Sequence, residues 1–156
     1  MSILRKLIDL GYRAAFRLAY PFAVIWWMFH GLGGAKIAVW ANGRVLLVRH
    51  SYRPGWKLPG GGIKAGEEPL AGAHRELAEE VGLDIDRDQL RFVLATRTVY
   101  GMAYLYEVQL EAEPVTRVDR REIVAASFRT PDAAAERNPA VRDYLRHRCN
   151  ISGGRA

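Results

Sequence analysis

The chain has 156 residues, a length that suits one domain of ordinary size with a hydrophobic core of its own. Hydrophobic residues make up 49% and charged residues 26%, a globular composition that excludes a wholly disordered chain. The single cysteine, Cys149, excludes an internal disulfide, and with no second cysteine beside it a metal or redox role is not expected.

The net charge of +6 is unevenly distributed along the chain. Residues 1–33 carry +3, residues 34–136 carry 14 basic and 15 acidic side chains, and residues 137–156 carry +4. The near-neutral middle argues against a chain built throughout to bind nucleic acid, and no sequence-specific nucleic-acid binding is expected. Each basic end could still meet an anionic surface, although solvated arginines that aid solubility are the simpler interpretation of the C-terminal end.

Residues 1–33 form a basic segment that is set apart from the rest. Residues 2–20 show the three- and four-residue spacing of an amphipathic helix, which Pro21 is expected to interrupt or kink. An apolar run follows, but Arg17 and Pro21 leave it too short for a membrane-spanning helix. Interfacial contact with a membrane, packing against the domain or a second subunit, and a targeting segment all remain open.

Residues 34–150 are expected to form one domain, followed by a flexible tail over residues 151–156. The two-residue turn Asn42-Gly43 joins two short apolar strands into a hairpin. Further strands are expected at 104–110 and 123–128, and the last stretch predicts short helices that turn Val141 and Leu145 inward.

A helix is expected from Pro69, which suits a first helical turn, to Val81, with Gly82 as its C-terminal stop. Glu76 and Glu80 are one turn apart on the face opposite its apolar stripe, and Glu79 is within reach of Glu76. Like charges at this spacing destabilise an isolated helix by roughly 0.2–0.5 kcal/mol per pair. A bound divalent cation explains the arrangement better, and oxygen-only ligands favour Mg²⁺ or Mn²⁺ over zinc.

These glutamates belong to a longer pattern, G-x5-E-x7-R-E-U-x-E-E-x-G-U with U aliphatic, which is complete from Gly61 to Leu83. The chain therefore resembles the Nudix hydrolases, whose signature is this Nudix box. The strand, Asn-Gly turn, strand and Trp-x-Leu-Pro-Gly-Gly segment before it are also similar to that family. The resemblance implies an α/β/α sandwich with a mixed sheet. It further implies hydrolysis of a diphosphate bond in a nucleoside diphosphate linked to another group.

The resemblance also implies roles for the box residues. Glu76, Glu79 and Glu80 would hold the Mg²⁺ or Mn²⁺, and Glu79 and Glu80 would act in catalysis at the attacking water. Glu67 and Arg75 would pair with each other and hold the helix that carries these ligands in place.

Phosphate binding is expected at the glycine loop of the box and just before it. Gly61 and Gly62 would allow tight backbone turns beside the metal and the phosphates. Arg53 and Lys57 are close in sequence to these glycines and are the basic residues expected to contact phosphate. Nothing in the sequence selects ADP-ribose, coenzyme A or an oxidised nucleotide as substrate.

The general base is left open between a box glutamate and two glutamates outside the box. Glu122 precedes the strand expected at 123–128, and Glu107 lies in the strand expected at 104–110. Each is explained equally well as an exposed strand or loop carboxylate. Glu122 is carried forward as the candidate catalytic residue.

Two other functions compete with a nucleotide hydrolase. A non-catalytic Nudix-fold module for nucleotide binding or regulation would be expected to lack box residues, and none is missing. The basic N-terminal helix motivates a membrane-associated Nudix enzyme that acts on a lipid-linked diphosphate. The expected location is the cytoplasm, with a peripheral position at the inner face of the membrane as an option. The expected partner is a small nucleotide, and a homodimer is a further option.

Overall fold

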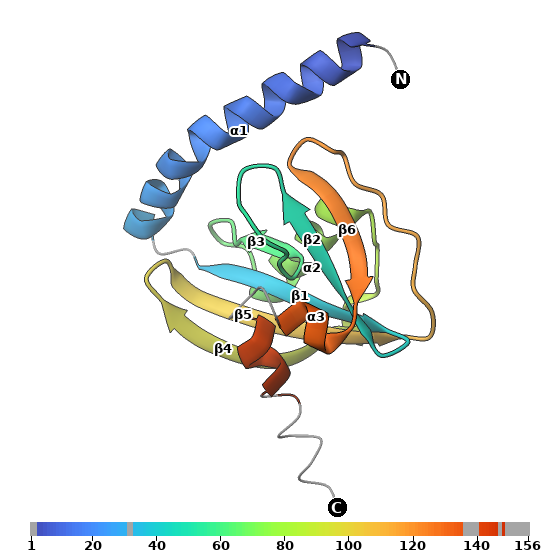
Figure 1. Cartoon of the computed structure of the whole chain (residues 1–156). Coiled ribbons are helices and arrows are strands. Elements are labelled where there is room, and N and C mark those ends of the chain that lie inside the picture. Colours follow the sequence, from blue (N-terminus) through green and yellow to red (C-terminus); the bar gives the residue numbers. More distant parts are fainter. Residues whose placement is uncertain (1–2, 31–32, 136–140, 147, 149–156) are drawn as a thin grey trace, which may run out of the picture.

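A mixed sheet with helices on both faces forms the body of the protein (Figure 1). The structure is a computed structural model that describes residues 3–30, 33–135, 141–146 and 148. The expected tail over 151–156 and Cys149 lie outside the described residues.

Six strands make up the sheet, and four of them correspond to the strands expected from the sequence. They are β1 (Gly34–Ala41), β2 (Arg44–His50), β3 (Gly60–Gly62), β4 (Arg91–Thr98), β5 (Gly101–Leu110) and β6 (Ile123–Arg129). Their order is β4-β5-β1-β2-β6, and β3 pairs with β1 off this path. The central pair β1 and β5 is parallel, and the other pairs are antiparallel.

The hairpin of β1 and β2 forms as the Asn-Gly turn predicts. Asn42 and Gly43 both have positive φ angles, 49° and 71°, as a two-residue turn between twisted antiparallel strands requires. Trp40 pairs with Val45 directly after the turn. This hairpin sets the register of the strands from which the site is built.

The helix α2 (Pro69–Val81) covers one face of the sheet and coincides with the predicted helix. Gly82 ends it in the left-handed conformation, with φ at 67°, and its N–H bonds the last turn. Leu77 lies in one buried cluster with Ile37 and Val39 of β1. Because this stripe is buried, the opposite face of α2 is left for the charged side chains.

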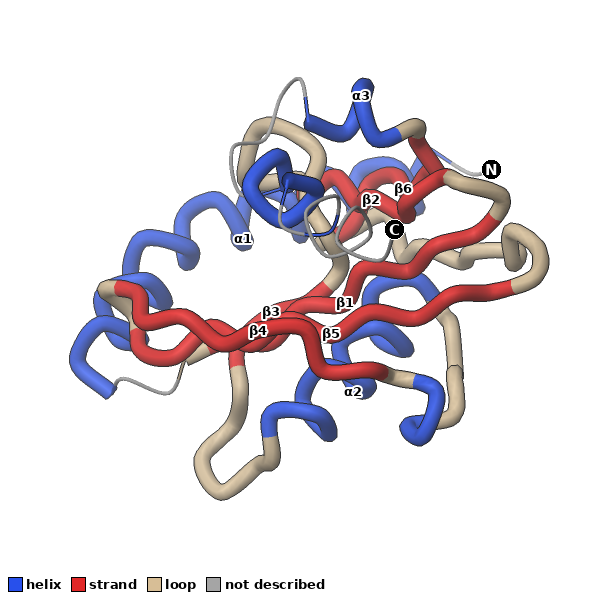
Figure 2. Tube along the Cα trace, turned by 90° about the horizontal axis from the view of Figure 1, so that it is seen from below, coloured by secondary structure: helices blue, strands red, loops and turns tan. Residues whose placement is uncertain are grey.

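The other face of the sheet is covered by α3 (Pro131–Ala135) and by the helical residues 141–146 (Figure 2). Val141 and Leu145 are buried, as predicted. The indole N–H of Trp40 donates a hydrogen bond of 2.7 Å to the hydroxyl of Tyr144, which ties this helical piece to β1. A short 3-10 helix, η1 (Arg87–Gln89), lies between α2 and β4. The predicted α/β/α sandwich with a mixed sheet is confirmed.

The N-terminal helix α1 (Ile3–His30) is longer than predicted, because it continues through Pro21 (Figure 1). A proline inside a helix removes one main-chain hydrogen bond and costs about 3 kcal/mol. In a helix of 28 residues, the turns on both sides of the proline offset that cost. Among the described residues, no helix is long and apolar enough to cross a membrane.

One face of α1 contacts the domain and the other faces outward. The guanidinium of Arg13 donates two hydrogen bonds, of 3.0 and 2.9 Å, to the main-chain carbonyl of Arg120. The Nε–H of Arg17 donates a hydrogen bond of 3.1 Å to the carbonyl of Ser51. The outward face carries exposed apolar side chains, which include Leu7, Leu10, Leu18 and Phe22.

Candidate active site

The short strand β3 brings glycine backbone against the carboxylates of α2. A β-carbon on Gly61 would lie 2.7 Å from the carboxylate of Glu76. A β-carbon on Gly60, whose φ is 134°, would lie 2.2 Å from the carbonyl oxygen of Ala35 in β1. Glycine is therefore required at position 60, where a side chain would push β3 away from its partner strand, whereas a side chain at position 61 would have to displace the carboxylate of Glu76.

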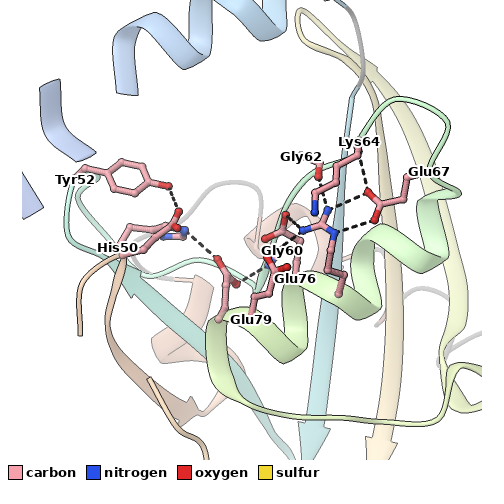
Figure 3. Close-up of polar contacts among 11 residues, drawn as sticks. His50, Tyr52, Gly60, Gly62, Lys64, Glu67, Glu76 and Glu79 are labelled. Atoms are coloured by element: carbon pink, nitrogen blue, oxygen red, sulfur yellow. Dashed lines mark hydrogen bonds and ion pairs between the residues drawn. The ribbon is translucent and has the colours of Figure 1, made fainter. Parts of the chain in front are cut away.

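Arg75 bridges the acidic side chains of α2, of which Figure 3 labels Glu76 and Glu79. Its guanidinium donates two hydrogen bonds to Glu67, of 2.8 and 3.0 Å, and one of 3.0 Å to the carbonyl of Gly62. It also contacts Glu76 at 2.7 Å and Glu79 at 3.1 Å. The hydrogen bonds from Arg75 are the main reason that the pKa of Glu67 falls to about 2. Arg75 thus links the loop before α2 to the helix.

Glu80 is held from two sides. One carboxylate oxygen accepts a hydrogen bond of 2.8 Å from the N–H of Gly60, and the other lies 3.2 Å from Nε2 of His50. Glu80 is only 7% exposed. These contacts fix the orientation of a nearly buried carboxylate that points toward the glycine strand.

The three glutamates suit a hard divalent cation by their chemistry, because Mg²⁺ and Mn²⁺ prefer carboxylate oxygens. Burial is the main reason that the pKa of Glu76 is raised; the contact with Arg75 lowers it, and the nearby charges of Glu80 and Glu79 raise it. A bound cation would add positive charge beside these carboxylates. Among the described residues, no three His, Cys, Asp or Glu side chains lie close enough together to form a metal site. Arg75 and His50 contact the carboxylates instead.

A pocket of about 530 Å³ opens beside these carboxylates. It brings together nearly all of the residues that the sequence singles out. Those that line it are Arg53, Lys57, Gly61, Gly62, Arg75, Glu76, Glu79, Glu80 and Glu122. Glu67 is not part of the lining and contacts Arg75 from the side of the loop.

Basic side chains gather on the wall of this pocket opposite α2. Lys36 of β1 and Lys57 line it together with Arg53. The pKa of each lysine is lowered, first because the surrounding protein removes water from the ammonium group and next because Arg53 repels a further positive charge. Three cations this close favour the binding of an anion such as phosphate.

Glu122 and Glu107, the two candidate bases outside the box, have different surroundings. Glu122 lines the pocket and accepts a hydrogen bond of 2.9 Å from the hydroxyl of Tyr52. Glu107 is buried on the face of the sheet toward α3, where it contacts Arg91 and accepts a hydrogen bond of 2.8 Å from Tyr144. Glu107 does not line the pocket of the box glutamates, so its position does not support a role as the general base. Its buried contacts give it a structural role.

Three pocket residues are not predicted from the sequence. Lys36 is in an apolar strand segment and shares a face of β1 with the buried residues Ala38 and Trp40, so the alternation of side chains does not mark it as a pocket residue. His50 ends β2 and approaches Glu80 only through the fold. Tyr20 comes from α1, and its ring lies 4.8 Å from that of Tyr52. No local signal in the sequence connects Tyr20 with the box, which begins at Gly61.

Comparison with known proteins agrees with this geometry. The model of the NUDIX domain matches residues 34–148. A MutT-like protein of Streptomyces ambofaciens is 33% identical over 114 residues, which cover 72% of this chain and 71% of that protein. An RNA pyrophosphohydrolase of Halorhodospira halophila is 50% identical over 42 residues, but these cover 27% of this chain and only 23% of that protein.

The fold is also similar to a solved structure, that of an Ap4A hydrolase binary complex from C. elegans. The two share a TM-score of 0.62 and 19% identity, over 78% of this chain and 98% of the other. At this identity the likeness concerns the fold. Together with the match of the domain model, the complete box and the pocket built around it, it shows that the chain belongs to the Nudix hydrolases, a family that acts on nucleoside diphosphate derivatives.

Proposed function

We propose that this protein hydrolyses the diphosphate bond of a nucleoside diphosphate linked to another group, and that the reaction requires Mg²⁺ or Mn²⁺. The supporting observation is one pocket in which three box glutamates face Lys36, Arg53 and Lys57. A diphosphate repels an incoming hydroxide, so its hydrolysis needs positive charge around the phosphate oxygens. The pocket offers both basic side chains for the phosphates and carboxylates for a cation.

Glu76, Glu79 and Glu80 are the residues that would hold the cation. When bound, it would neutralise phosphate oxygens and make water more acidic. Arg75 acts through the glutamates, because its bonds to Glu67 and to Glu76 fix the position of the acidic face. Arg75 and Glu67 are therefore positioning residues.

Glu122 is the proposed acceptor of the proton from the attacking water. Its carboxylate lines the same pocket as the box glutamates, and the hydrogen bond from Tyr52 orients it. A general base must lie within hydrogen-bond reach of the water whose proton it takes, directly or through one further water. Glu122 meets this requirement better than Glu107, which does not line this pocket.

A hydrolysis screen tests the proposed function. The substrates are nucleoside triphosphates, ADP-ribose, dinucleoside polyphosphates, CDP-alcohols and capped RNA, each with and without Mg²⁺, and Glu80→Gln serves as the blank. The proposal expects Mg²⁺-dependent release of product from at least one nucleotide class, with no activity in the variant. Folded protein that binds Mg²⁺ and cleaves none of them would instead favour a binding module or a lipid-linked substrate.

A second proposal concerns the outward face of α1. Its exposed apolar side chains, Leu7, Leu10, Leu18 and Phe22, lie in a segment that carries a net charge of +3 over residues 1–33. An apolar stripe on a basic helix suits the surface of an anionic membrane. We propose peripheral contact of this kind, which would hold a cytoplasmic enzyme at the inner face of the membrane. The competing outcome is that a second copy of the chain binds the same apolar side chains.

A further inference from the structure

A second cavity lies between α1 and the end of β2, and we call it the arginine cleft. It encloses about 620 Å³. Four arginines from three segments line it: Arg13 and Arg17 from α1, Arg49 from β2, and Arg53 from the loop that follows. It shares His50, Tyr52 and Arg53 with the pocket of the box glutamates. The two cavities therefore adjoin.

The positive charge of the arginine cleft is not neutralised by the protein. In the part of the chain that the structure describes, none of its four arginines forms an ion pair with a carboxylate. Arg13 and Arg17 are held by main-chain carbonyl oxygens, which fix their positions and leave their charges in place. Four guanidinium groups around one cavity repel one another unless an anion lies between them.

The other two arginines are also positioned by neutral groups. The guanidinium of Arg49 lies 5.8 Å from the ring centre of Trp56, and that of Arg53 lies 5.1 Å from the ring centre of Tyr20. Such contacts orient a guanidinium and leave its N–H groups free to point elsewhere. Contacts within the protein thus hold all four arginines of the cleft in position without a ligand.

Polar groups without a protein partner line the same cavity. The hydroxyl of Ser51 and Nδ1 of His50 are buried, and neither has a hydrogen-bond partner among the described residues. Both residues line the arginine cleft. A buried polar group without a partner costs about 1–3 kcal/mol unless a ligand or water satisfies it. A phosphate oxygen could accept a hydrogen bond from the hydroxyl of Ser51.

We propose that the arginine cleft binds a phosphate group of the same ligand whose diphosphate occupies the adjoining pocket. This inference rests on the proposed function and adds a substrate class to it: nucleotides that carry a further phosphate beyond the 5′-polyphosphate chain, which a nucleoside triphosphate lacks. Guanidinium groups bind phosphate through paired N–H donors, which matches the four arginines. Tyr52 lines both cavities, and its ring centre lies 4.8 Å from that of Tyr20 in a tilted arrangement. Aromatic rings at this junction suit a nucleobase between the two phosphate sites.

Steady-state kinetics with a matched pair of substrates test the proposal. One is a nucleoside triphosphate, and the other is the corresponding 5′-triphosphorylated dinucleotide, which carries one more phosphate. Arg17→Gln and Arg49→Gln should each raise the KM of the dinucleotide about tenfold and leave the KM of the triphosphate within about twofold. kcat should stay the same for both substrates.

Arg49→Gln and a control variant, Arg87→Gln, show whether a change in KM is specific to the cleft. Arg49 takes no part in the hydrogen bonds that fasten α1, so Arg49→Gln removes charge without loosening the helix. Arg87→Gln removes the same charge from η1, whose residues line neither cavity, and should change neither KM. Equal increases in both KM values, or none in either, would overturn the proposal.

Vesicle flotation distinguishes a lipid phosphate from a nucleotide phosphate. The vesicles contain phosphatidylcholine with phosphatidic acid, and the full chain is compared with its Arg17→Gln variant. If the variant no longer floats while its KM for the dinucleotide is unchanged, the cleft binds a lipid phosphate and the proposal is wrong.

Direct binding separates this proposal from the proposed function. If the wild-type protein cleaves neither substrate, the hydrolase proposal fails, and fluorescence anisotropy with a labelled 5′-phosphorylated dinucleotide still tests the cleft. Weaker binding by Arg17→Gln and Arg49→Gln, but not by Arg87→Gln, supports the phosphate site. The same affinity in all four proteins contradicts it.

Discussion

The carboxylate of Glu76 lies in the space that a side chain on Gly61 would need, with 2.7 Å between it and the position of a β-carbon there. Gly61→Ala must therefore displace the end of Glu76. A flexible side-chain end moves at little cost, so the free energy of unfolding should change by less than about 1 kcal/mol. Since Glu76 is a proposed metal ligand, kcat/KM should fall roughly 10–100-fold. Urea unfolding and Mg²⁺-dependent kinetics measure the two effects.

Gly60→Ala is the matched control for that variant. Its β-carbon would meet the carbonyl oxygen of Ala35 at 2.2 Å, and backbone cannot move aside as a side-chain end can. The positive φ of 134° adds strain. Gly60→Ala should destabilise the protein by about 1–3 kcal/mol. Full activity in Gly61→Ala would show that the position of Glu76 is not critical to the reaction.

Glu80→Gln should leave the fold intact and lower kcat by about a thousandfold, because it removes one of the charges that hold the cation. An amide can still accept the hydrogen bond from Gly60, so little stability should be lost. Activity is measured at saturating Mg²⁺, with Glu113→Gln, a carboxylate in a surface ion pair with Arg44, as the control. Near-normal turnover in Glu80→Gln would remove Glu80 from the list of ligands.

The pair of Glu67 and Arg75 predicts a pH-dependent stability. The folded pKa of Glu67 is lowered from 4.5 to about 2, so its contribution is complete above the unfolded pKa and is lost as the pH falls through about 2. Glu67→Gln should cost about 1–2 kcal/mol near pH 7. Urea unfolding of both proteins between pH 7 and pH 3 should show this difference shrinking below about pH 4.5. A constant difference would mean that the ion pair contributes nothing in the native state.

Glu122→Gln and Glu107→Gln should have opposite effects. Glu122→Gln should reduce kcat about 10²–10⁴-fold with little loss of stability, because it removes the proposed base. Glu107→Gln should destabilise the protein, because it removes the buried partner of Arg91, and the protein that remains folded should keep its kcat. Kinetics corrected for the folded fraction, together with urea unfolding, separate the two outcomes. The opposite result would make Glu107 the base and give Glu122 the structural role.

Leu18→Gln combined with Phe22→Gln should reduce flotation of the full chain with anionic vesicles. Both side chains are 73% exposed on the outward face of α1, so the changes should not affect folding. Val115→Gln, an exposed apolar residue outside α1, is the control. Equal flotation of all three proteins would rule out the apolar stripe as the membrane contact, and a change in oligomer size would favour a second copy of the chain.

Sequence patterns predict those parts of the structure whose physical cause is local. The start, the stop and the buried stripe of the helix from Pro69 to Val81 are all determined by residues 69–82, and the helix forms as expected. The Asn42-Gly43 turn is equally local. The pairing of Arg75 with Glu67 also follows from the box, since both residues belong to one loop and helix.

The parts that could not be predicted depend on contacts between distant segments. In the sequence, Glu107 lies in a strand, as a carboxylate that lines the pocket also could. Only the register of β5 against β1 shows that Glu107 is on the face of the sheet toward α3. His50 reaches Glu80 through the arrangement of β2 and α2. Pro21 was expected to interrupt or kink the N-terminal helix, and α1 continues through it from Ile3 to His30.

The position of Tyr20 has a practical consequence for work on this enzyme. The match to the NUDIX domain starts at residue 34, whereas Tyr20 lies in α1 and forms part of the wall of the pocket. A chain shortened to the matched region would keep every residue of the box and lose one side of the cavity that receives the substrate. Substrate preferences measured on such a fragment would describe a wider pocket than the one that the full chain presents.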